Sequence, residues 1–334
     1  MTTRYDAAHE PSSLAGPGDA RPTALQIIHD NKLENALTDK VILVTGTSSG
    51  LGIETVRALK VTGARIYGTA RDLEKGRKAL ADVLEPGKVE LLQLDTASFE
   101  SVRACARDFL AKESKLNILI NNAGIMALPE RVLTKDRHEA QFQTNHLGHF
   151  LLFQLLKPTM LATSEPRFAS RVVNVSSAGH RQSQIRFDDL TFDQPDSYAP
   201  FAAYGQSKTA NIYMANEIER RYGAQGLHAW SLHPGAIHTG LATHLDFSAL
   251  LAVPEIQKSM KSPEQGAATT VLAAVDKELE GKGGKYLDNT AISPPIDPAR
   301  KHELAAPGYE SWIYDEEAAK QLWTVSGQIV GVDE

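Results

Sequence analysis

The chain has 334 residues, 42% of them hydrophobic, and a formal net charge of −6 at pH 7. This content can bury one large core or two small ones, and the acidic balance argues against nucleic acid or an anionic membrane as the main partner. The single cysteine, Cys105, excludes an intrachain disulfide and is expected to be a small core residue. With no apolar run long enough to span a membrane and no signal-peptide core, the sequence predicts a cytoplasmic protein without a membrane anchor.

The N-terminal part is expected to precede the main sheet. Residues 1–22 are polar with Gly and Pro, which predicts a flexible tail. Leu25, Ile28 and Leu33 follow at helical spacing and predict a short helix near the first strand. Strand-like and helix-like segments then alternate from residue 41 to residue 235. This pattern predicts one doubly wound α/β domain over 23–334, with a parallel sheet and helices on both faces.

A strand, a glycine-rich turn and a helix open this domain. Residues 41–44 (VILV) form an apolar run typical of a buried parallel strand. Gly46, Gly50 and Gly52 follow with the spacing G-x3-G-x-G, and an amphipathic helix begins after them. Glycine lets the backbone approach a pyrophosphate, and the N–H groups at the helix N-terminus face its charge. The segment therefore predicts a dinucleotide phosphate site.

Two later strands bring polar groups to the same edge of the sheet. The run 116–120 ends in the sequence NNAG at 121–124, where amides can fix neighbouring strands and small residues leave room for a ribose or adenine. Another strand delivers Ser177. A serine nucleophile needs a histidine base and oxyanion donors, but His180 lies only three residues on and no G-x-S-x-G elbow surrounds Ser177. A hydroxyl that donates to a carbonyl is the better interpretation.

Tyr204 and Lys208 lie four residues apart on a predicted helix. This spacing places both side chains on one face, about one turn apart. A phenol with a pKa near ~10 is a poor acid–base catalyst at neutral pH, but a neighbouring cation favours the phenolate. Alone, the pair could be a chance surface pair; in order after the preceding motifs, it predicts an acid–base site.

In this order, the motifs resemble those of the classical short-chain dehydrogenases/reductases, from about residue 40 to residue 240. The matching segments are TGTSSGLG at 45–52, Asp95 after the third strand, NNAG at 121–124, Asn145 in NHLGHF, Ser177, Tyr204 with Lys208, and PGAIHT at 234–239. The interval of 27 residues between Ser177 and Tyr204 is long for the family. With HRQSQIRFDDL inside it, the chain is similar to the branch that contains retinol dehydrogenases and the WW-domain oxidoreductase. The resemblance implies a Rossmann-type domain with a seven-stranded parallel sheet.

The resemblance also implies roles for the matched residues. Tyr204 would pass a proton to or from the substrate oxygen, while Lys208 would lower its pKa and hold the nicotinamide ribose. Ser177 would hydrogen-bond the substrate carbonyl, and Asn145 would hold a water that links Lys208 to solvent. The implied cofactor-binding residues are Gly46, Ser48, Ser49, Gly50, Leu51, Gly52, Asp95, Asn122, Ala123, Gly124, Tyr204, Lys208, Pro234, Gly235, Ile237 and Thr239.

The end of the second strand bears on the choice of cofactor. An NAD enzyme would place a carboxylate there to accept the adenosine ribose hydroxyls, but the sequence has Ala70 followed by Arg71. A guanidinium suits a 2′-phosphate, and Asp72 is better explained as the cap of the next helix. Ser49 stands where some NADP enzymes of the family carry a second basic residue, which leaves a single-residue clamp. The sequence thus favours NADP(H) over NAD(H), with Arg71 as the discriminating residue.

The region after the nicotinamide motif is expected to set specificity. Residues 240–262 are mostly apolar and favour a substrate lid over a simply packed helix. With Met126 and Ala178 nearby, the lid indicates a small hydrophobic ketone, aldehyde or alcohol as substrate, which His180 could also contact. A C-terminal extension over about 284–334 is expected to close the pocket or to pack against a partner subunit.

Several alternatives stay open. His146 and His149 are three residues apart, but no Cys, Asp or Glu lies at ligand spacing near them, so no metal site is predicted. A non-redox isomerase, epimerase or cyclase could use the same tyrosine and lysine, and an NADPH-binding sensor could use the same fold. The sequence leaves open whether the chain forms a homo-oligomer, because the family includes monomers, dimers and tetramers.

Overall fold

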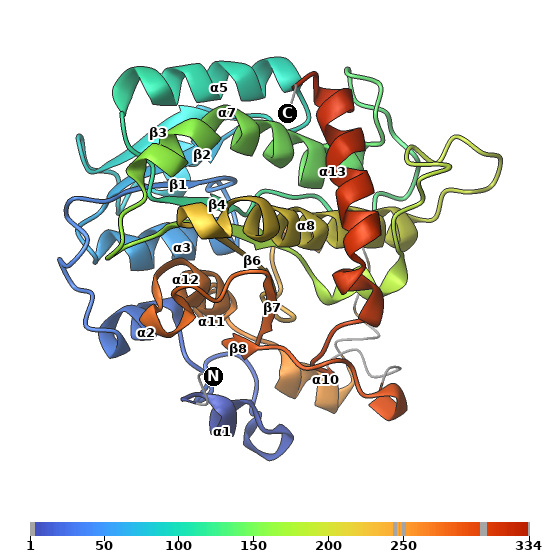
Figure 1. Cartoon of the computed structure of the whole chain (residues 1–334). Helices are drawn as coiled ribbons and strands as arrows, with labels where there is room; N and C mark the ends of the chain where they lie inside the picture. Colours follow the sequence, from blue (N-terminus) through green and yellow to red (C-terminus); the bar gives the residue numbers. More distant parts are fainter. Residues whose placement is uncertain (1–3, 243–245, 247, 249–251, 301–305, 333–334) are drawn as a thin grey trace.

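The computed structural model describes residues 4–332 except 243–245, 247, 249–251 and 301–305. Within these residues, strands form one sheet in the order β3-β2-β1-β4-β5-β6-β7-β8 (Figure 1). Strands β1 to β7 run parallel, and β8 runs antiparallel to β7. The strands are β1 Val41–Val44, β2 Arg65–Ala70, β3 Val89–Gln93, β4 Ile118–Asn121, β5 Ser170–Val175, β6 Leu227–His233, β7 Lys285–Asp288 and β8 Ala291–Ile292.

The eighth strand corrects the expected number of seven. Asn289 and Thr290, between β7 and β8, both have positive φ, at 51° and 60°. Two such residues form the kind of tight turn that matches the twist of an antiparallel pair. The chain therefore folds back after β7 and adds a two-residue antiparallel strand to the parallel sheet.

Helices cover both faces of the sheet, as predicted (Figure 1). One hydrophobic core joins residues of α5, α7, α8 and α13 to the sheet, and a second joins residues of α2, α3 and α12 to its other face. The longer helices are α2 Ala24–Asp30, α3 Leu51–Lys60, α4 Leu73–Ala79, α5 Phe99–Lys112, α7 Gly148–Thr163, α8 Pro200–Tyr222, α12 Ala268–Val275 and α13 Glu316–Val330, and the shorter ones are α1 Asp6–His9, α6 Ala140–Phe142, α10 Pro254–Ser259 and α11 Pro263–Gly266.

The C-terminal helix α13 lies across α7 and α8 (Figure 1). Trp323 packs edge-on against Phe150 and Phe153, with ring centres 5.0 and 6.1 Å apart. Trp312 and Tyr314 belong to a separate 3-10 turn at Ser311–Tyr314, just before α13. The extension therefore buries aromatic side chains against its own domain.

The N-terminal segment also differs from the expected flexible tail. Tyr5 and Arg21 are 8% and 3% exposed, and the Arg21 side chain bonds the end of α10. The predicted short helix is α2, in which Ile27 and Ile28 are buried and Leu25 is 43% exposed, and Leu33 follows after its end. The helix begins after Thr23, whose side chain accepts from the N–H of Gln26.

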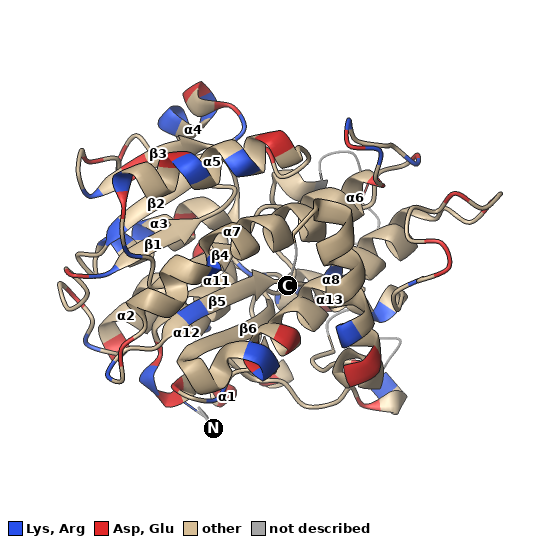
Figure 2. Ribbon diagram, turned by 45° about the horizontal axis from the view of Figure 1, so that its top comes forward, with Lys and Arg blue, Asp and Glu red and all other residues tan. Residues whose placement is uncertain are grey.

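The surface mixes both signs of charge. In the view of Figure 2, Lys and Arg alternate with Asp and Glu over the loops and the helix surfaces. Among the described residues, no helix combines the length and apolar character that crossing a membrane requires.

The order of the strands determines where on the sheet a ligand site can form. The chain passes from β1 out to β3 and then crosses back to β4, so β1 and β4 are neighbours at a point where the direction of winding reverses. Val44 pairs with Ile120, and Ile120 pairs with Val173, so these strands end close together. In open α/β sheets, ligands bind at the carboxyl ends of the strands at such a reversal.

Candidate active site

A cavity of about 940 Å³ lies at this edge of the sheet. Its volume is near the upper end of ligand pockets, which span roughly 300–1,000 Å³. Most of the sequence-predicted residues line it, namely Gly46, Ser48, Ser49, Gly50, Leu51, Arg71, Asn122, Ala123, Gly124, Met126, Ser177, Ala178, Tyr204, Lys208, Pro234, Gly235, Ile237 and Thr239. The predicted residues outside its lining are Gly52, Asp95, Asn145 and His180.

The glycine turn is shaped by backbone conformation and close packing. Gly46 and Gly50 have φ of +73° and +62°, where a side chain is strained. A Cβ on Gly52 would lie 2.3 Å from the carbonyl oxygen of Gly46. Gly52 thus allows helix α3 to approach the turn, while the preceding residues face the cavity. The N-terminus of α3 points its free N–H groups to the place where a pyrophosphate would bind.

The segment after β4 is tied to this turn. The Nδ2 group of Asn122 donates to the carbonyl oxygens of Thr45 and Gly46, at 2.8 and 3.2 Å. The hydroxyl of Thr45 accepts from the N–H groups of Asn122 and Ala123, both at 2.9 Å. These bonds support the prediction that the amides fix neighbouring strands.

Asn145 lies in a π-helical turn, Gln143–Leu147, and is completely buried. Its Oδ1 accepts from the N–H of Ile125 at 2.9 Å, and its Nδ2 donates to the carbonyl oxygen of Ile125 and to the hydroxyl of Ser207. Its backbone oxygen bonds Nδ1 of His149 at 2.9 Å. Asn145 therefore braces the loop after β4 against α8, and it does not line the cavity.

His149 extends this brace to the glycine turn. Its Nε2 bonds the hydroxyl of Thr45 at 2.9 Å, and burial lowers its pKa to about 4. A neutral imidazole with both nitrogens hydrogen-bonded is a structural group. In the part of the chain that the structure describes, no cluster of His, Cys, Asp or Glu could hold a metal ion.

Ser177, Tyr204 and Lys208 meet at one end of the cavity. Tyr204 and Lys208 are each 4% exposed. The Nζ of Lys208 donates to the carbonyl oxygen of Val175 at 3.1 Å and lies 5.5 Å from the centre of the Tyr204 ring. The ring packs so closely on Gly179 that a Cβ there would lie 2.6 Å from Cε1. The structure thus brings together the predicted acid–base set and holds the tyrosine in place.

Burial governs the protonation of this pair. It raises the pKa of Tyr204 to about 12, against the opposing effect of a hydrogen bond with Ser177. It lowers the pKa of Lys208 to about 8. The sequence led us to expect that Lys208 would lower the tyrosine pKa, but in this structure desolvation of the phenolate has the larger effect. At neutral pH the phenol holds its proton and can donate it.

Arg71 and Lys75 line the opposite end of the cavity. Both side chains are exposed, and among the described residues neither forms an ion pair. Asp72 caps α4 by accepting from the N–H of Lys75 at 3.1 Å, which confirms the cap interpretation. Lys75 was not among the predicted residues. The signal for it was the predicted cap, because a helix that begins after Asp72 brings Lys75 close to Arg71.

Asp95 forms hydrogen bonds within its own turn. One carboxylate oxygen accepts from the N–H of Ala97 at 3.0 Å, and its own N–H donates to the hydroxyl of Ser101. Its neighbours Leu94 and Thr96 line the cavity. The predicted contact between Asp95 and adenine stays a prediction.

The substrate end is mostly apolar. The predicted Met126 and Ala178 line it together with Leu241, Ile256 and Met260 of the predicted lid, whereas Leu128 and Phe201 were not predicted. His180 was predicted wrongly: it is completely buried behind the site, with Nδ1 bonded to the carbonyl oxygen of Ser177 at 2.7 Å and its ring against Tyr286. Of the lid predicted over 240–262, residues 240, 241, 256, 259 and 260 line the cavity, and 243–245, 247 and 249–251 lie outside the described residues.

The donor set fits a nicotinamide dinucleotide. Because a Cβ at Gly46 would lie 2.8 Å from Cα of Ala123 and one at Gly52 2.3 Å from the carbonyl oxygen of Gly46, these glycines let the turn pack closely. The backbone from Ser48 to Leu51 then lines the cavity at the N-terminus of α3. Cationic groups for a phosphate lie at one end of the cavity, and the buried Tyr204 and Lys208 lie at the other. This arrangement of charge and space is the one that such a cofactor requires.

Comparison with known proteins agrees with this site. The short chain dehydrogenase family model matches residues 40–188. The chain is 51% identical over 322 residues to short-chain dehydrogenase/reductase prx1 of Penicillium roqueforti, covering 96% of this chain and 93% of the relative. It is 36% identical over 302 residues to human retinol dehydrogenase 13, covering 88% and 85%. The crystal structure of an uncharacterised Mycobacterium paratuberculosis protein superposes with a TM-score of 0.69 and 32% identity, covering 94% of this chain and 99% of that one.

Proposed function

Because the chain belongs to the short-chain dehydrogenase/reductase family, we propose that it is an NADP(H)-dependent oxidoreductase that interconverts a hydrophobic ketone or aldehyde and its alcohol. The observation that carries this proposal is that Ser177, Tyr204 and Lys208 line the same cavity, together with apolar side chains. A sensor would not need a buried acid–base pair, so the intact pair favours catalysis.

The cofactor would be held along the whole cavity. The turn from Gly46 to Leu51 would bind the pyrophosphate, Asn122 to Gly124 would contact the adenosine, and the segment 234–239 would fix the carboxamide. Lys208 would hold the nicotinamide ribose. When bound, the nicotinamide supplies or accepts the hydride.

The protein's own groups would handle the proton and the oxygen. In reduction, the Tyr204 hydroxyl donates its proton to the carbonyl oxygen, and in oxidation the tyrosinate takes the proton back from the alcohol. Ser177 donates a hydrogen bond to the same oxygen, which stabilises the negative charge that develops there. The Lys208 ammonium stabilises the tyrosinate that reduction leaves behind.

Arg71 and Lys75 support the choice of NADP(H). A 2′-phosphate carries up to two negative charges, and two cations without ion-pair partners among the described residues can bind it without first breaking other contacts. Ala70 at the end of β2 is 2% exposed and offers no carboxylate to a ribose. Both features favour the phosphorylated cofactor.

The substrate is proposed to be a small apolar carbonyl or alcohol. The apolar residues that line the cavity include Met126, Leu128, Phe201, Ile256 and Met260. Burial of an apolar ligand surface against such side chains is favourable by roughly 25 cal/mol per Å². Human retinol dehydrogenase 13, a relative by sequence, is named for an apolar alcohol.

A fluorescence titration of cofactor-stripped protein with NADPH and with NADH tests this function first. We expect NADPH to bind at least ten times more tightly, about 1.4 kcal/mol, and apolar aldehydes then to be reduced with NADPH. Tighter binding of NADH would contradict the cofactor assignment. A substrate isomerised without net oxidation of NADPH would contradict the redox assignment.

A further inference from the structure

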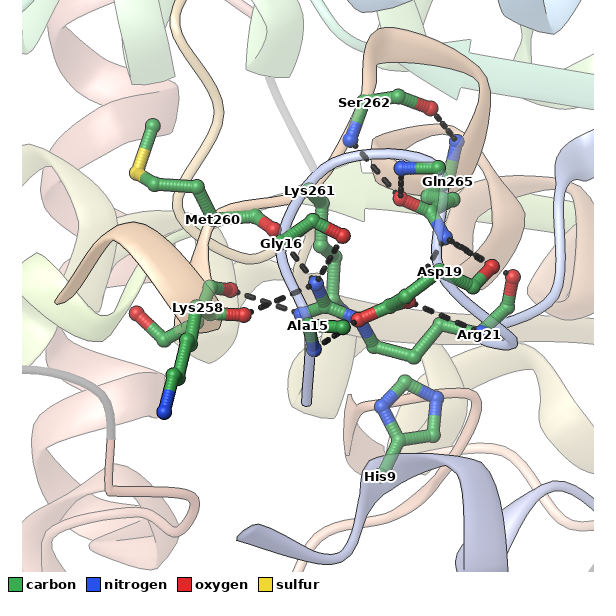
Figure 3. A network of polar contacts seen from close by, with 12 residues as sticks. His9, Ala15, Gly16, Asp19, Arg21, Lys258, Met260, Lys261, Ser262 and Gln265 are labelled. Atoms are coloured by element: carbon green, nitrogen blue, oxygen red, sulfur yellow. Dashed lines mark hydrogen bonds and ion pairs between the residues drawn. The ribbon is translucent and has the colours of Figure 1, made fainter. Parts of the chain in front are cut away.

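A buried arginine joins the N-terminal segment to the end of α10. The guanidinium of Arg21 points at the C-terminal end of α10 (Figure 3). Nη1 donates to the carbonyl oxygen of Ser259 at 2.7 Å, and Nη2 donates to those of Lys258 and Met260. A helix leaves its last carbonyls without partners, and Arg21 supplies partners for three consecutive ones. The N-terminal segment therefore caps α10.

Two further side chains hold Arg21 in this position. Asp19 accepts from Nε of Arg21 at 2.8 Å, and the two side chains are 4% and 2% exposed. Gln265 donates to the Asp19 carboxylate at 3.0 Å and to the backbone oxygen of Arg21 at 3.1 Å, while its own oxygen accepts from Gly18. Although burial alone would raise it, hydrogen bonds from Arg21 and Ala15 hold the pKa of Asp19 at about 2. Arg21 is therefore held by Asp19 and Gln265 as well as by the carbonyls of α10.

The capped segment forms part of the cavity wall. Ile256, Ser259 and Met260 line the cavity. The next residue, Lys261, donates its N–H to the carbonyl oxygen of Ala236 at 2.9 Å, beside the predicted nicotinamide-binding loop. The position of the α10 end thus decides how far two apolar side chains extend into the substrate end.

Helix α10 is short and lies at the surface. It has six residues, none of them buried, and a helix this short is not stable by itself in water. A planar guanidinium donates in several directions at fixed angles, so one arginine can hold three carbonyls in a single arrangement. Loss of this cap would free the wall of the cavity without touching Tyr204 or Lys208.

We propose that Arg21 is a positioning residue for substrate specificity: it fixes the C-terminal end of α10 and thereby the places of Ile256 and Met260 in the cavity. This inference rests on the proposed function, because it assigns the same cavity to an apolar carbonyl. It adds that the N-terminal segment, although far from the catalytic groups in the sequence, sets the shape of the substrate end.

Arg21→Met tests the inference, with Arg103→Met as the matched control. Arg103 also donates to the last carbonyl oxygen of a helix, Val330 of α13, but it does not line the cavity. With NADPH, we expect Arg21→Met to change the ratio of kcat/KM for decanal to that for butanal by about ten-fold, with NADPH affinity within three-fold of wild type. Arg103→Met should leave the ratio unchanged. An unchanged ratio in Arg21→Met, or equal changes in both variants, would overturn the proposal.

A second measurement does not depend on turnover. Lys258 is exposed on α10, and its carbonyl bonds Arg21. Trypsin should cleave after Lys258 at least five times faster in Arg21→Met than in wild type or Arg103→Met, and equal rates would refute the anchoring. If Arg21→Met does not fold, Asp19→Asn should show the same changes in smaller measure, because it removes the charge that orients Arg21. A wild-type protein that reduces neither aldehyde refutes the proposed function, while the cleavage rates still decide whether Arg21 anchors α10.

Discussion

The ammonium nitrogen of Lys208 lies 5.5 Å from the centre of the Tyr204 ring, and both side chains are buried. Burial shifts their pKa values in opposite directions, down to about 8 for Lys208 and up to about 12 for Tyr204. Both groups therefore disfavour their charged forms in the protein without ligand. Any negative charge that forms on Tyr204 is stabilised by the nearest cation, which is the basis of the first prediction.

Lys208→Met should weaken cofactor binding and slow turnover. Charge-assisted hydrogen bonds contribute about 1.5–3 kcal/mol, so we expect NADPH affinity to fall at least ten-fold and turnover to fall further. Lys157→Met is the matched control, because Lys157 also lies over a tyrosine ring, at 5.1 Å from that of Tyr222, but outside the cavity lining. Fluorescence titration and steady-state rates measure both effects. Unchanged affinity in Lys208→Met would contradict the ribose contact.

Cofactor binding should weaken in alkaline solution. Because burial lowers the pKa of Lys208 to about 8, its ammonium is present below that pH and is lost as pH rises through it. If the bound cofactor requires the charged form, the NADPH dissociation constant should rise up to ten-fold per pH unit above about 8. This rise should disappear in Lys208→Met.

Lys261 provides the control for this pH dependence. Burial also lowers its pKa to about 8, and its Nζ lies 3.4 Å from the carbonyl oxygen of Pro234, behind the cavity wall. Titrations of Lys261→Met should keep the alkaline rise. If the rise survives in Lys208→Met and vanishes in Lys261→Met, Lys261 rather than Lys208 causes it, and the prediction is wrong.

Arg71→Ala and Lys75→Ala should each reduce the preference for NADPH. Both cations line the adenosine end of the cavity, and loss of either should weaken NADPH binding about three- to ten-fold and leave NADH binding unchanged. Lys78→Ala, a change of another exposed lysine on α4, should affect neither cofactor. Equal losses for NADPH and NADH would show that these residues do not contact a 2′-phosphate.

Gly179→Ala should disturb the tyrosine. The new Cβ would lie 2.6 Å from Cε1 of Tyr204 and 3.3 Å from Oγ of Ser177, and the ring is too buried to move freely. We expect turnover to fall at least ten-fold while NADPH affinity stays within three-fold. Gly327→Ala on α13, where the nearest atom is 3.4 Å away, should keep full activity. Normal rates in Gly179→Ala would show that the ring position is not critical.

The sequence predicted the catalytic end well because its residues are carried by local patterns. Tyr204 and Lys208 are one helical turn apart, and the glycine turn follows directly from a buried strand. By contrast, Arg21 meets Met260 across 239 residues, and no spacing rule indicates such a contact. His180 was misassigned because proximity to Ser177 in the sequence does not tell which way a 3-10 turn directs the ring.

The protonation states of Tyr204 and Lys208 also could not be predicted without knowing the fold. A cation four residues from a tyrosine suggests a lowered pKa, but the sequence does not reveal how completely both groups are desolvated. Likewise, Asn145 appears as a water-binding residue by resemblance, whereas three of its side-chain contacts in the structure go to Ile125 and Ser207. Tertiary packing determines both the desolvation of the pair and the contacts of Asn145.

The most direct test of the account is NADPH oxidation by wild type and by Tyr204→Phe, measured with an apolar aldehyde together with the alcohol produced. The account predicts one alcohol per NADPH in wild type and a loss of about 10²–10⁴-fold in turnover in the variant, with NADPH affinity nearly unchanged. Near wild-type turnover in Tyr204→Phe would contradict the assignment of Tyr204 as the proton donor.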